Sequence, residues 1–592
     1  MSPATPEEKI VALRRSLVAK RSALLSMTPE NALGEILNDP QPAALVHAFP
    51  EEDLHILVHE IGLEDALPLL ALASHRQLEY LLDKELWLRD RLDFGAAGKW
   101  FARLLRADAP ARRLVQWLAE KQSDLVELFL GRSIEVRMRE HDQDPSVFGP
   151  DFFTYDNVYY IRIIGAPPSE EGATAAATEA RPRDTVKRLL DELAENDYVR
   201  FQALVLEAVH LLPSETEEEV YRLRSGRLAE KGFLPFDEAV GLYQPLNEQA
   251  FSRTAQRRDP MLAEHPDCFP LVPAAVLPED NLFTQALAAI DSPEQRQTLQ
   301  EEFAALCNRI IVADGQTIHR REELAAVVAK ASGYLSIGLE KRQRSAEAAR
   351  GVATAVKILQ RYHLEGLFRL GYHEALRLKQ AAEKWARESW FAARGLPLTF
   401  WDEQWMGIIG GLLIKRPLFF DNYQSGTLYR EFAKSEDIAW TRSRLEQVQT
   451  FDTLLSRLHD DRAALPKGRF LTYKSLLLTR WARCRLSLPE VVEPLPLAVF
   501  RPFFKTLFQP AAGSADEHKR RIPAFLKEDF LRWLAARSQE PPDDLAAAVG
   551  ASLAGLFEEL EEHYGRIRPE DIDPRYIVHF LLRHTPAGPH PR

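Results

Sequence analysis

The 592-residue chain is poor in cysteine and has no long apolar run, and each shortage excludes a class of protein. Its three cysteines, Cys268, Cys307 and Cys484, lie far apart, so they predict neither a disulfide framework nor a C-x-x-C zinc clip. A reducing, cytoplasmic setting is therefore expected. The best membrane candidate, residues 406–414, is far shorter than the roughly 20 residues of a spanning helix. We expect no transmembrane segment.

The chain also lacks an excess of basic residues. It has 75 Lys and Arg against 87 Asp and Glu, a formal net charge of -12, and such a charge repels phosphate backbones at long range. No nucleic-acid partner is expected. The hydrophobic share of 46% is typical of globular proteins, and the length favours several domains over one.

Nucleotide-binding and hydrolase loops are absent from the sequence as well. "GAAGKW" (95–100) lacks the spacing and the Ser or Thr of a phosphate-binding loop, and "GIIGG" (407–411) follows no strand. "QSGTL" (424–428) lacks the flanking glycines of a nucleophile elbow. These absences favour a protein that is not an enzyme and that needs no cofactor.

What is present is helical periodicity. Residues 1–131 predict a superhelix of short amphipathic helices, because leucines recur at spacings of three and four. The period changes to two in Ile134–Met138 and a β-rich run follows at 152–164, which predicts one small β-hairpin over 132–164. A flexible linker is expected at 165–184, then helical domains at 185–510 and a C-terminal helical segment at 511–592. The predicted fold class is mainly α, a multi-domain helical array.

His55 and His59 lie four residues apart in "PEEDLHILVHEIG" and are the first candidates for a metal site. On a helical wheel they lie outside the apolar face formed by Leu54, Leu57, Val58 and Ile61. Zinc needs three or four ligands, and no H-E-x-x-H pattern adds a general base here. We interpret both histidines as surface or groove-lining residues and expect no metal at this pair.

His459 and Asp460, in "RLHDDR", are the weak metal candidates, because helical phosphohydrolases carry adjacent His and Asp ligands. The nearest upstream histidines, His363 and His373, are farther away than that arrangement usually allows. An ordinary solvated helix end is the favoured interpretation.

Residues 310–324, "IIVADGQTIHRREEL", are similar to the A-D-G turn of tellurite-resistance-type helical domains. A corner between two helices is expected, with Gly315 in a left-handed conformation and Asp314 capping the next helix.

Residues 466–488 contain six cations and no acid, which raises the possibility of an anion or membrane-surface contact. The cations do not form one stripe on a helical wheel, and pairing with acids inside the protein is favoured. The residues of the low-ranked anion- or partner-binding hypothesis are Lys474, Arg480, Trp481, Arg483 and Arg485. Aromatic residues are concentrated at 385–430, where a domain core is favoured over an anchoring groove.

Longer segments of the chain resemble two further families. The rhythm of "PEEDLHILVHEIGLEDALPLLALASHRQLEYLLD" resembles the N-terminal helical superhelix of bacterial magnesium transporters and the related flagellar switch proteins. "RLRSGRLAEKGFLPFDEAVGLYQPL" (222–246), "NRIIVADG" (308–315), "IKRPLFFD" (414–421) and "LLLTRWARCRLSL" (476–488) resemble a bacterial family known as domain-of-unknown-function family six-one-seven-eight. That resemblance covers most of the chain and implies no activity.

The leading functional hypothesis is a cytoplasmic, non-enzymatic helical scaffold or regulatory protein that binds protein partners, since stacked helices form extended grooves. One alternative is a metal-dependent, phosphohydrolase-like enzyme centred on His459 and Asp460. The other is an anion or membrane-surface binder that uses the basic residues at 467–485.

Overall fold

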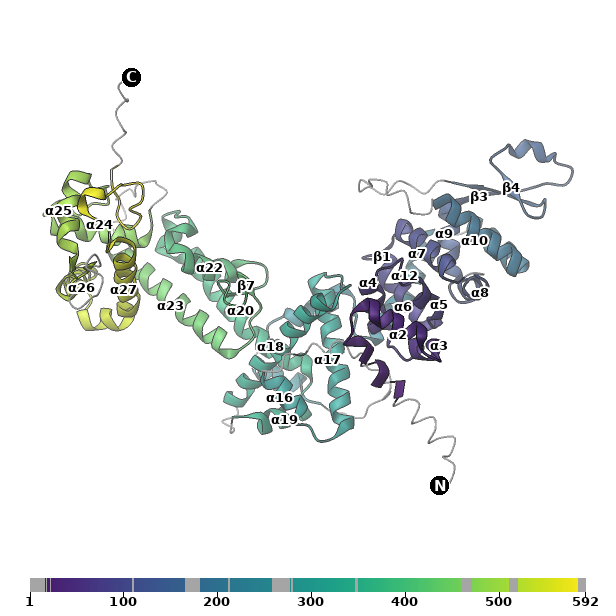
Figure 1. Cartoon of the computed structure of the whole chain (residues 1–592), viewed down its shortest axis with the longest axis horizontal. Coiled ribbons are helices and arrows are strands. Elements are labelled where there is room, and N and C mark those ends of the chain that lie inside the picture. The colour runs from purple at the N-terminus through teal and green to yellow at the C-terminus, as the bar shows by residue number, and fades with distance from the viewer. Residues whose placement is uncertain are drawn as a thin grey trace, which may run out of the picture. The chain divides into compact units, whose positions relative to one another are not determined.

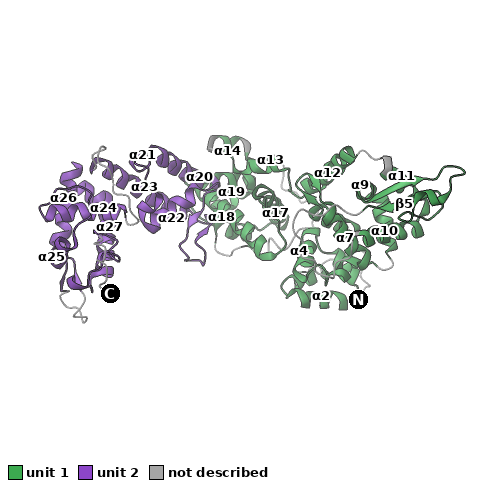
Figure 2. Cartoon of the chain, turned by 90° about the horizontal axis from the view of Figure 1, so that it is seen from above, with its two compact units in different colours: residues 1–371 green, residues 372–592 purple. Residues whose placement is uncertain are grey.

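The computed structural model describes residues 16–17, 19–21, 23–108, 111–164, 182–210, 213–246, 248–257, 277, 281–345, 350–458, 471–510 and 520–583. Within these ranges the chain is mainly α-helical with short antiparallel strand pairs, which confirms the predicted fold class. The chain divides into two compact units, residues 1–371 and 372–592 (Figure 2). The predicted linker lies outside the described residues as far as residue 181.

Unit 1 begins with a succession of short helices (Figure 1). They are α2 (Pro29–Asn38), α3 (Pro42–His47), α4 (Glu51–Ile61), α5 (Leu67–Leu72), α6 (His75–Glu85), α7 (Phe94–Ala107), α8 (Arg112–Lys121) and α9 (Ser123–Ser133). Proline at the first or second helical position starts α2, α3 and α5, where its missing N–H costs no intrahelical bond. Each helix is too short to bury a face alone, so it packs on its neighbours: α4 on α6, and α5 on α7.

The predicted hairpin is a three-stranded antiparallel sheet in the order β3–β5–β4, formed by β3 (Ile134–Met138), β4 (Phe153–Thr154) and β5 (Tyr159–Ile163). The β-rich run at 152–164 predicts one strand, but the structure divides it into β4 and β5. The carboxylate of Asp156 accepts hydrogen bonds from the backbone N–H of Val158 and Tyr159, at 2.8 and 2.9 Å. This turn folds β4 back onto β5. A smaller ribbon joins β1 (Trp87–Leu88) and β2 (Arg91–Leu92).

The remaining helices of unit 1 are longer on average. They are α10 (Pro182–Asn196), α11 (Tyr198–His210), α12 (Pro213–Glu230), α13 (Phe236–Val240), α14 (Glu248–Thr254), α16 (Leu282–Ala288), α17 (Pro293–Asp314), α18 (Arg321–Ser345), α19 (Val352–Arg361) and α20 (Leu364–Glu388), within which the unit boundary falls. Short 3-10 turns occur at η1 (Pro145–Phe148) and η2 (Gly241–Tyr243). Helices α10 and α11 pack on α7, α8 and α9, while α17 packs on α13 and α18.

Two glycines allow the backbones of α18 and α20 to touch. A Cβ at Gly338 would lie 2.1 Å from the carbonyl oxygen of Leu367, and one at Gly371 would lie 1.9 Å from that of Tyr334. No side chain fits at either position without moving backbone, so the crossing of these helices requires glycine on both.

Unit 2 continues with α21 (Trp390–Ala393), η3 (Leu398–Trp401), α22 (Asp402–Leu413), α23 (Ser435–Leu458), α24 (Tyr473–Arg485), α25 (Leu497–Leu507), α26 (Ala524–Ser538), α27 (Pro542–Tyr564) and η4 (Pro569–Asp571). Two short ribbons accompany them, β6 (Phe419–Phe420) with β7 (Tyr429–Arg430), and β8 (Gln509–Pro510) with β9 (Arg520–Arg521).

The aromatic concentration at 385–430 forms a core, as the sequence predicts. Trp401 and Phe400 are fully buried, and Trp405 stacks on Tyr473 with ring centroids 4.8 Å apart. The exception is Tyr423, which is 64% exposed. Among the described helices of both units, none combines the length and the apolar character that crossing a bilayer requires.

Candidate metal centre

Four side chains from three remote segments of unit 1 converge on one point. The Nε2 atoms of His55 and His59 lie 2.7 and 3.0 Å from Oε1 of Glu85, and Nε2 of His319 lies 3.4 Å from the same oxygen. The four donor atoms all lie within 4.8 Å of one another. Three imidazoles therefore surround a single carboxylate oxygen.

Helix α4 supplies two of the donors from one of its faces. His55 and His59 are one helical turn apart, so their side chains lie side by side, and their ring centroids are 4.7 Å apart. The first turn of α4 contains three acidic residues, Glu51, Glu52 and Asp53, whose negative charges interact favourably with the positive end of the helix dipole. The helix ends at Gly62, whose φ of 102° suits glycine.

Of the two interpretations, surface or groove-lining, the first is wrong for His55, which is only 3% exposed and lines a small cavity. Its ring packs edge-on against Tyr80 of α6, and residues 318–319 cover the same side of α4. His59 is largely buried as well. The helical wheel identified one apolar face, whereas α4 is covered on a second face by segments distant in sequence.

Glu85 is the last residue of α6, and the start of that helix is firmly anchored. Ser74 and Gln77 form a capping box, and the side-chain amide of Gln77 also donates to the carbonyls of Val46 and Phe49, at 2.8 Å each. These bonds fix α6 against the loop that precedes α4. The register of α6 then places Glu85 beside His55 and His59.

His319 comes from the corner between α17 and α18. Gly315 is left-handed, with φ of 64°, as the sequence predicts, and Gln316 N–H donates to the carbonyl of Ile311 in a Schellman turn. Asp314 accepts a hydrogen bond from Tyr243 and pairs with Lys330 of α18. At the start of α18, the carboxylate of Glu323 accepts from the backbone N–H of His319 and Arg320.

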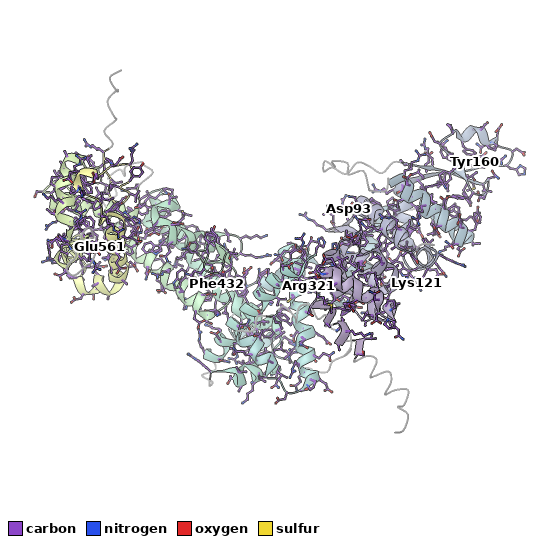
Figure 3. The ribbon with its side chains drawn as sticks, in the orientation of Figure 1. Asp93, Lys121, Tyr160, Arg321, Phe432 and Glu561 are labelled. Carbon is purple, nitrogen blue, oxygen red and sulfur yellow. The ribbon has the colours of Figure 1, made fainter. Side chains whose placement is uncertain are left out.

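Arg321 fastens this corner to the N-terminal helices. Its guanidinium pairs with Glu60 of α4 at 2.8 Å and donates to the carbonyl of Leu25, and its backbone N–H donates to Glu60 at 3.1 Å. Figure 3 marks Arg321 at the start of α18, on the side of the N-terminal helices. The position of His319 is therefore set by contacts on both of its sides.

The electrostatics of the cluster favour a neutral His55 beside an ionised Glu85. Burial lowers the pKa of His55 to about 4, against the opposing effect of Glu85. Burial raises the pKa of Glu85, but the hydrogen bonds from His319, His55 and His59 outweigh it and leave that pKa well below its usual range. His319 has a raised pKa because of its hydrogen bond to Glu85.

The donor set fits a divalent transition-metal ion. Bonds of about 2.0–2.2 Å to nitrogen and oxygen place neighbouring donors of a tetrahedral zinc ion roughly 3.3 Å apart. The separations of 2.7 to 3.4 Å between Glu85 and the three histidines are close to this value. Imidazole suits zinc, iron, copper and nickel, and the carboxylate supplies a negative charge.

A small cavity of about 40 Å³ lies beside His55, with room for a few water molecules. It is also lined by Tyr80, Lys84, Phe233 and Asn308. The ammonium group of Lys84 lies 3.9 Å from the centroid of the Phe233 ring, and burial lowers the pKa of Lys84 to about 8. The cavity is therefore a mainly apolar pocket, with a few polar groups, beside one prospective ligand.

The basic residues of α24 make contacts inside unit 2. Trp481 is fully buried and donates to Asp529, and Arg480 and Arg483, 9% and 7% exposed, donate to the backbone carbonyls of Leu458 and Pro489. Lys474 pairs with Asp402 and Glu559, and Arg485 lies 3.5 Å from Asp529. Lys467 and Arg469 lie outside the described residues, as do His459 and Asp460.

Sequence reasoning singled out His55 and His59 but missed Glu85 and His319. The i, i+4 histidine pair is the signal in the sequence, but two donors are fewer than the three or four that zinc needs. His319 lies within the 310–324 segment, which was interpreted as a helix corner alone. Nothing in a single sequence joins that corner to α4, because the connection depends on tertiary packing.

Comparison with known protein families identifies a family for this chain. The sequence pattern of a family described as "Family of unknown function (DUF6178)" matches residues 8–583. No curated protein and no solved structure matches the chain. The resemblance of the N-terminal helices to magnesium transporters and flagellar switch proteins is therefore not shown.

Proposed function

The chain belongs to the DUF6178 family, a family of unknown function, and we propose that it is a metalloprotein with a structural ion in unit 1. A divalent transition-metal ion, with zinc as the best match, joins α4 and α6 to the corner between α17 and α18. The observation that carries the proposal is the convergence of three imidazole Nε2 atoms on Oε1 of Glu85.

An ion-pair cluster without metal accounts less well for this geometry. Oε1 of Glu85 is hydrogen-bonded to His55 and His59, while the buried Nε2 of His319, 3.4 Å from the same oxygen, lacks a hydrogen bond of good geometry. One carboxylate also neutralises only one imidazolium, and His55, with a pKa of about 4, is uncharged at neutral pH. A metal ion satisfies all four donors at once, because each nitrogen then directs a lone pair, and not a proton, towards the centre.

The donor number favours a structural role over a catalytic one. Four protein ligands complete a tetrahedral shell, whereas catalytic zinc sites keep one position open for water. The ion then holds a helical scaffold together. We propose further that this scaffold binds protein partners in the cytoplasm. The free thiols of Cys307 and Cys484 are consistent with a reducing compartment.

Cobalt(II) substitution tests the coordination directly, because four-coordinate Co²⁺ has intense visible absorption bands and six-coordinate Co²⁺ does not. We expect the metal-free full-length chain to develop these bands on titration with Co²⁺, and His319→Ala to lose the bands that come from this site. The control is His141→Ala, a fully exposed histidine of unit 1. Identical spectra for wild type and His319→Ala would overturn the proposal.

A further inference from the structure

A second group of prospective ligands lies in unit 2, on α27 and the segment that follows it. Glu559 and His563 are four residues apart on α27, which places their side chains on one face of the helix. His579 approaches from the C-terminal segment, and its Nε2 lies 2.8 Å from Oε1 of Glu559. The donor atoms of these three residues lie within 4.8 Å of one another. Figure 3 marks Glu561, on the same helix.

We propose that Glu559, His563 and His579 form a second divalent-metal site, of the open, three-ligand kind. Two histidines and one glutamate are the donor set of several catalytic zinc sites, in which water or substrate takes the fourth position. This proposal rests on residues of unit 2 alone and does not depend on the site in unit 1.

A hydrogen bond to the second ring nitrogen fixes the orientation of His579, as is usual for histidines that bind metal. Its Nδ1 lies 2.8 Å from the hydroxyl of Tyr564, and that hydroxyl accepts a hydrogen bond from the backbone N–H of Val578 at 3.1 Å. Ligand histidines commonly have their second ring nitrogen bonded to an outer partner in this way, and the bond fixes the orientation of the ring. His579 is only 3% exposed, so its ring has little freedom to turn elsewhere.

The carboxylate of Glu559 is held in a similar way. Lys474 donates to its Oε2 at 2.6 Å, which leaves Oε1 directed at His579. Lys474 also pairs with Asp402 at 3.0 Å. Because this second carboxylate balances the lysine charge, Lys474 repels a bound metal ion less strongly. Burial raises the pKa of Glu559, but its bonds to His579 and Lys474 prevail and lower that pKa to about 2. The carboxylate is thus ionised whether or not an ion is bound.

His563 distinguishes this site from the one in unit 1. It is exposed, and its ring lies edge-on to that of His579 with centroids 5.4 Å apart. An ion here would be bound at the protein surface, where its open position is within reach of water and of small anions. We therefore expect weaker and more readily exchanged metal than at the four-ligand site.

Isothermal titration of the metal-free full-length chain with Zn²⁺ tests the proposal. His563→Ala is the variant, because its side chain is exposed and packs in no core. We expect His563→Ala to lose one binding event, with affinity reduced by roughly a hundredfold or more, since even outer-shell changes cost 10–100-fold. The matched control is Glu562→Gln, an exposed carboxylate on the same helix, which should bind as wild type does.

The double variant His319→Ala/His563→Ala separates the two sites. If both proposals hold, each single variant loses one event and the double variant loses both. If only the unit 1 site fails, His319→Ala matches wild type while His563→Ala still loses an event. Titrations in which His563→Ala and wild type are indistinguishable overturn the second site.

Discussion

The imidazole rings of His59 and His319 stack with their centroids 4.0 Å apart and their planes inclined by 14°. Two imidazolium cations would repel each other at such a distance. Both rings direct Nε2 towards Oε1 of Glu85. This relationship joins α4 to the α17–α18 corner, and the following expectations derive from it and from the packing around it.

Bound metal should stabilise unit 1 against unfolding. A ligand that binds only the folded state adds about 2.7 kcal/mol when its free concentration is 100 times its Kd. We expect urea unfolding followed by circular dichroism to show this gain on adding Zn²⁺ to the metal-free protein. Glu85→Gln should abolish most of the gain, while His141→Ala should retain it. An equal response in Glu85→Gln and wild type would contradict the assignment of Glu85 as a ligand.

Arg321 should support metal binding without being a ligand. Arg321→Ala removes the guanidinium contacts to Glu60 and Leu25, which hold the residues beside His319. We expect the Kd for Zn²⁺ at this site to rise roughly tenfold, the size of effect seen for outer-shell partners. Arg320→Ala, at an exposed neighbouring position, is the control and should leave the Kd unchanged. Equal Kd values for both variants would show that the corner is positioned by other contacts.

The contact between α18 and α20 should depend on Gly338. A methyl group there would lie 2.1 Å from the carbonyl oxygen of Leu367, so Gly338→Ala should lower the free energy of unfolding by about 1–3 kcal/mol. Gly34 in α2 has no atom within 4 Å of a built Cβ. Gly34→Ala should therefore raise stability, by roughly 0.5–1 kcal/mol, through helix propensity. Thermal unfolding that moved in the same direction for both variants would refute this packing.

Unit 1 should lose stability as pH rises because of Glu127 on α9. Burial, followed by a hydrogen bond with Glu207 of α11, raises the pKa of Glu127 to about 7. The unfolded chain has the ordinary value of 4.5, so between about pH 4.5 and 7 the folded state holds a proton that the unfolded state releases. Stability from this group is therefore full below the lower value and lost as pH rises through the upper one.

Glu127→Gln keeps the shape and removes the charge. We expect it to stabilise the protein by on the order of 1–2 kcal/mol at pH 8 and to have little effect at pH 4.5. Denaturant unfolding at the two pH values measures the difference, with Glu120→Gln, exposed on α8, as the control. A gain of equal size at both pH values would mean that Glu127 does not hold the extra proton.

Features of the fold could be predicted from the sequence where they depend on residues close together in the chain. The helical period, the left-handed Gly315 and the aromatic core around Trp401 all depend on neighbouring residues or on simple burial. The burial of His55 could not be predicted, because it depends on Tyr80 and on residues that follow α17. For the same reason Asp314, an apparent helix cap in sequence, pairs with Lys330 in the fold.

The prediction of one strand over 152–164 is wrong for a local reason. Residues 152–164 are rich in β-branched and aromatic residues, but the Asp156 side chain forms a turn that interrupts the run. Turn chemistry within a β-rich run competes with strand extension, and the hydrophobic pattern alone does not show which prevails.

The central claim is that His55, His59, Glu85 and His319 hold an ion, and the metal content of the purified full-length chain tests it most directly. We expect elemental analysis after dialysis against metal-free buffer to find tightly bound zinc or a related ion, and His59→Ala to contain one equivalent less than wild type and than His141→Ala. The same metal content in His59→Ala and wild type, with both proteins folded, would contradict the account.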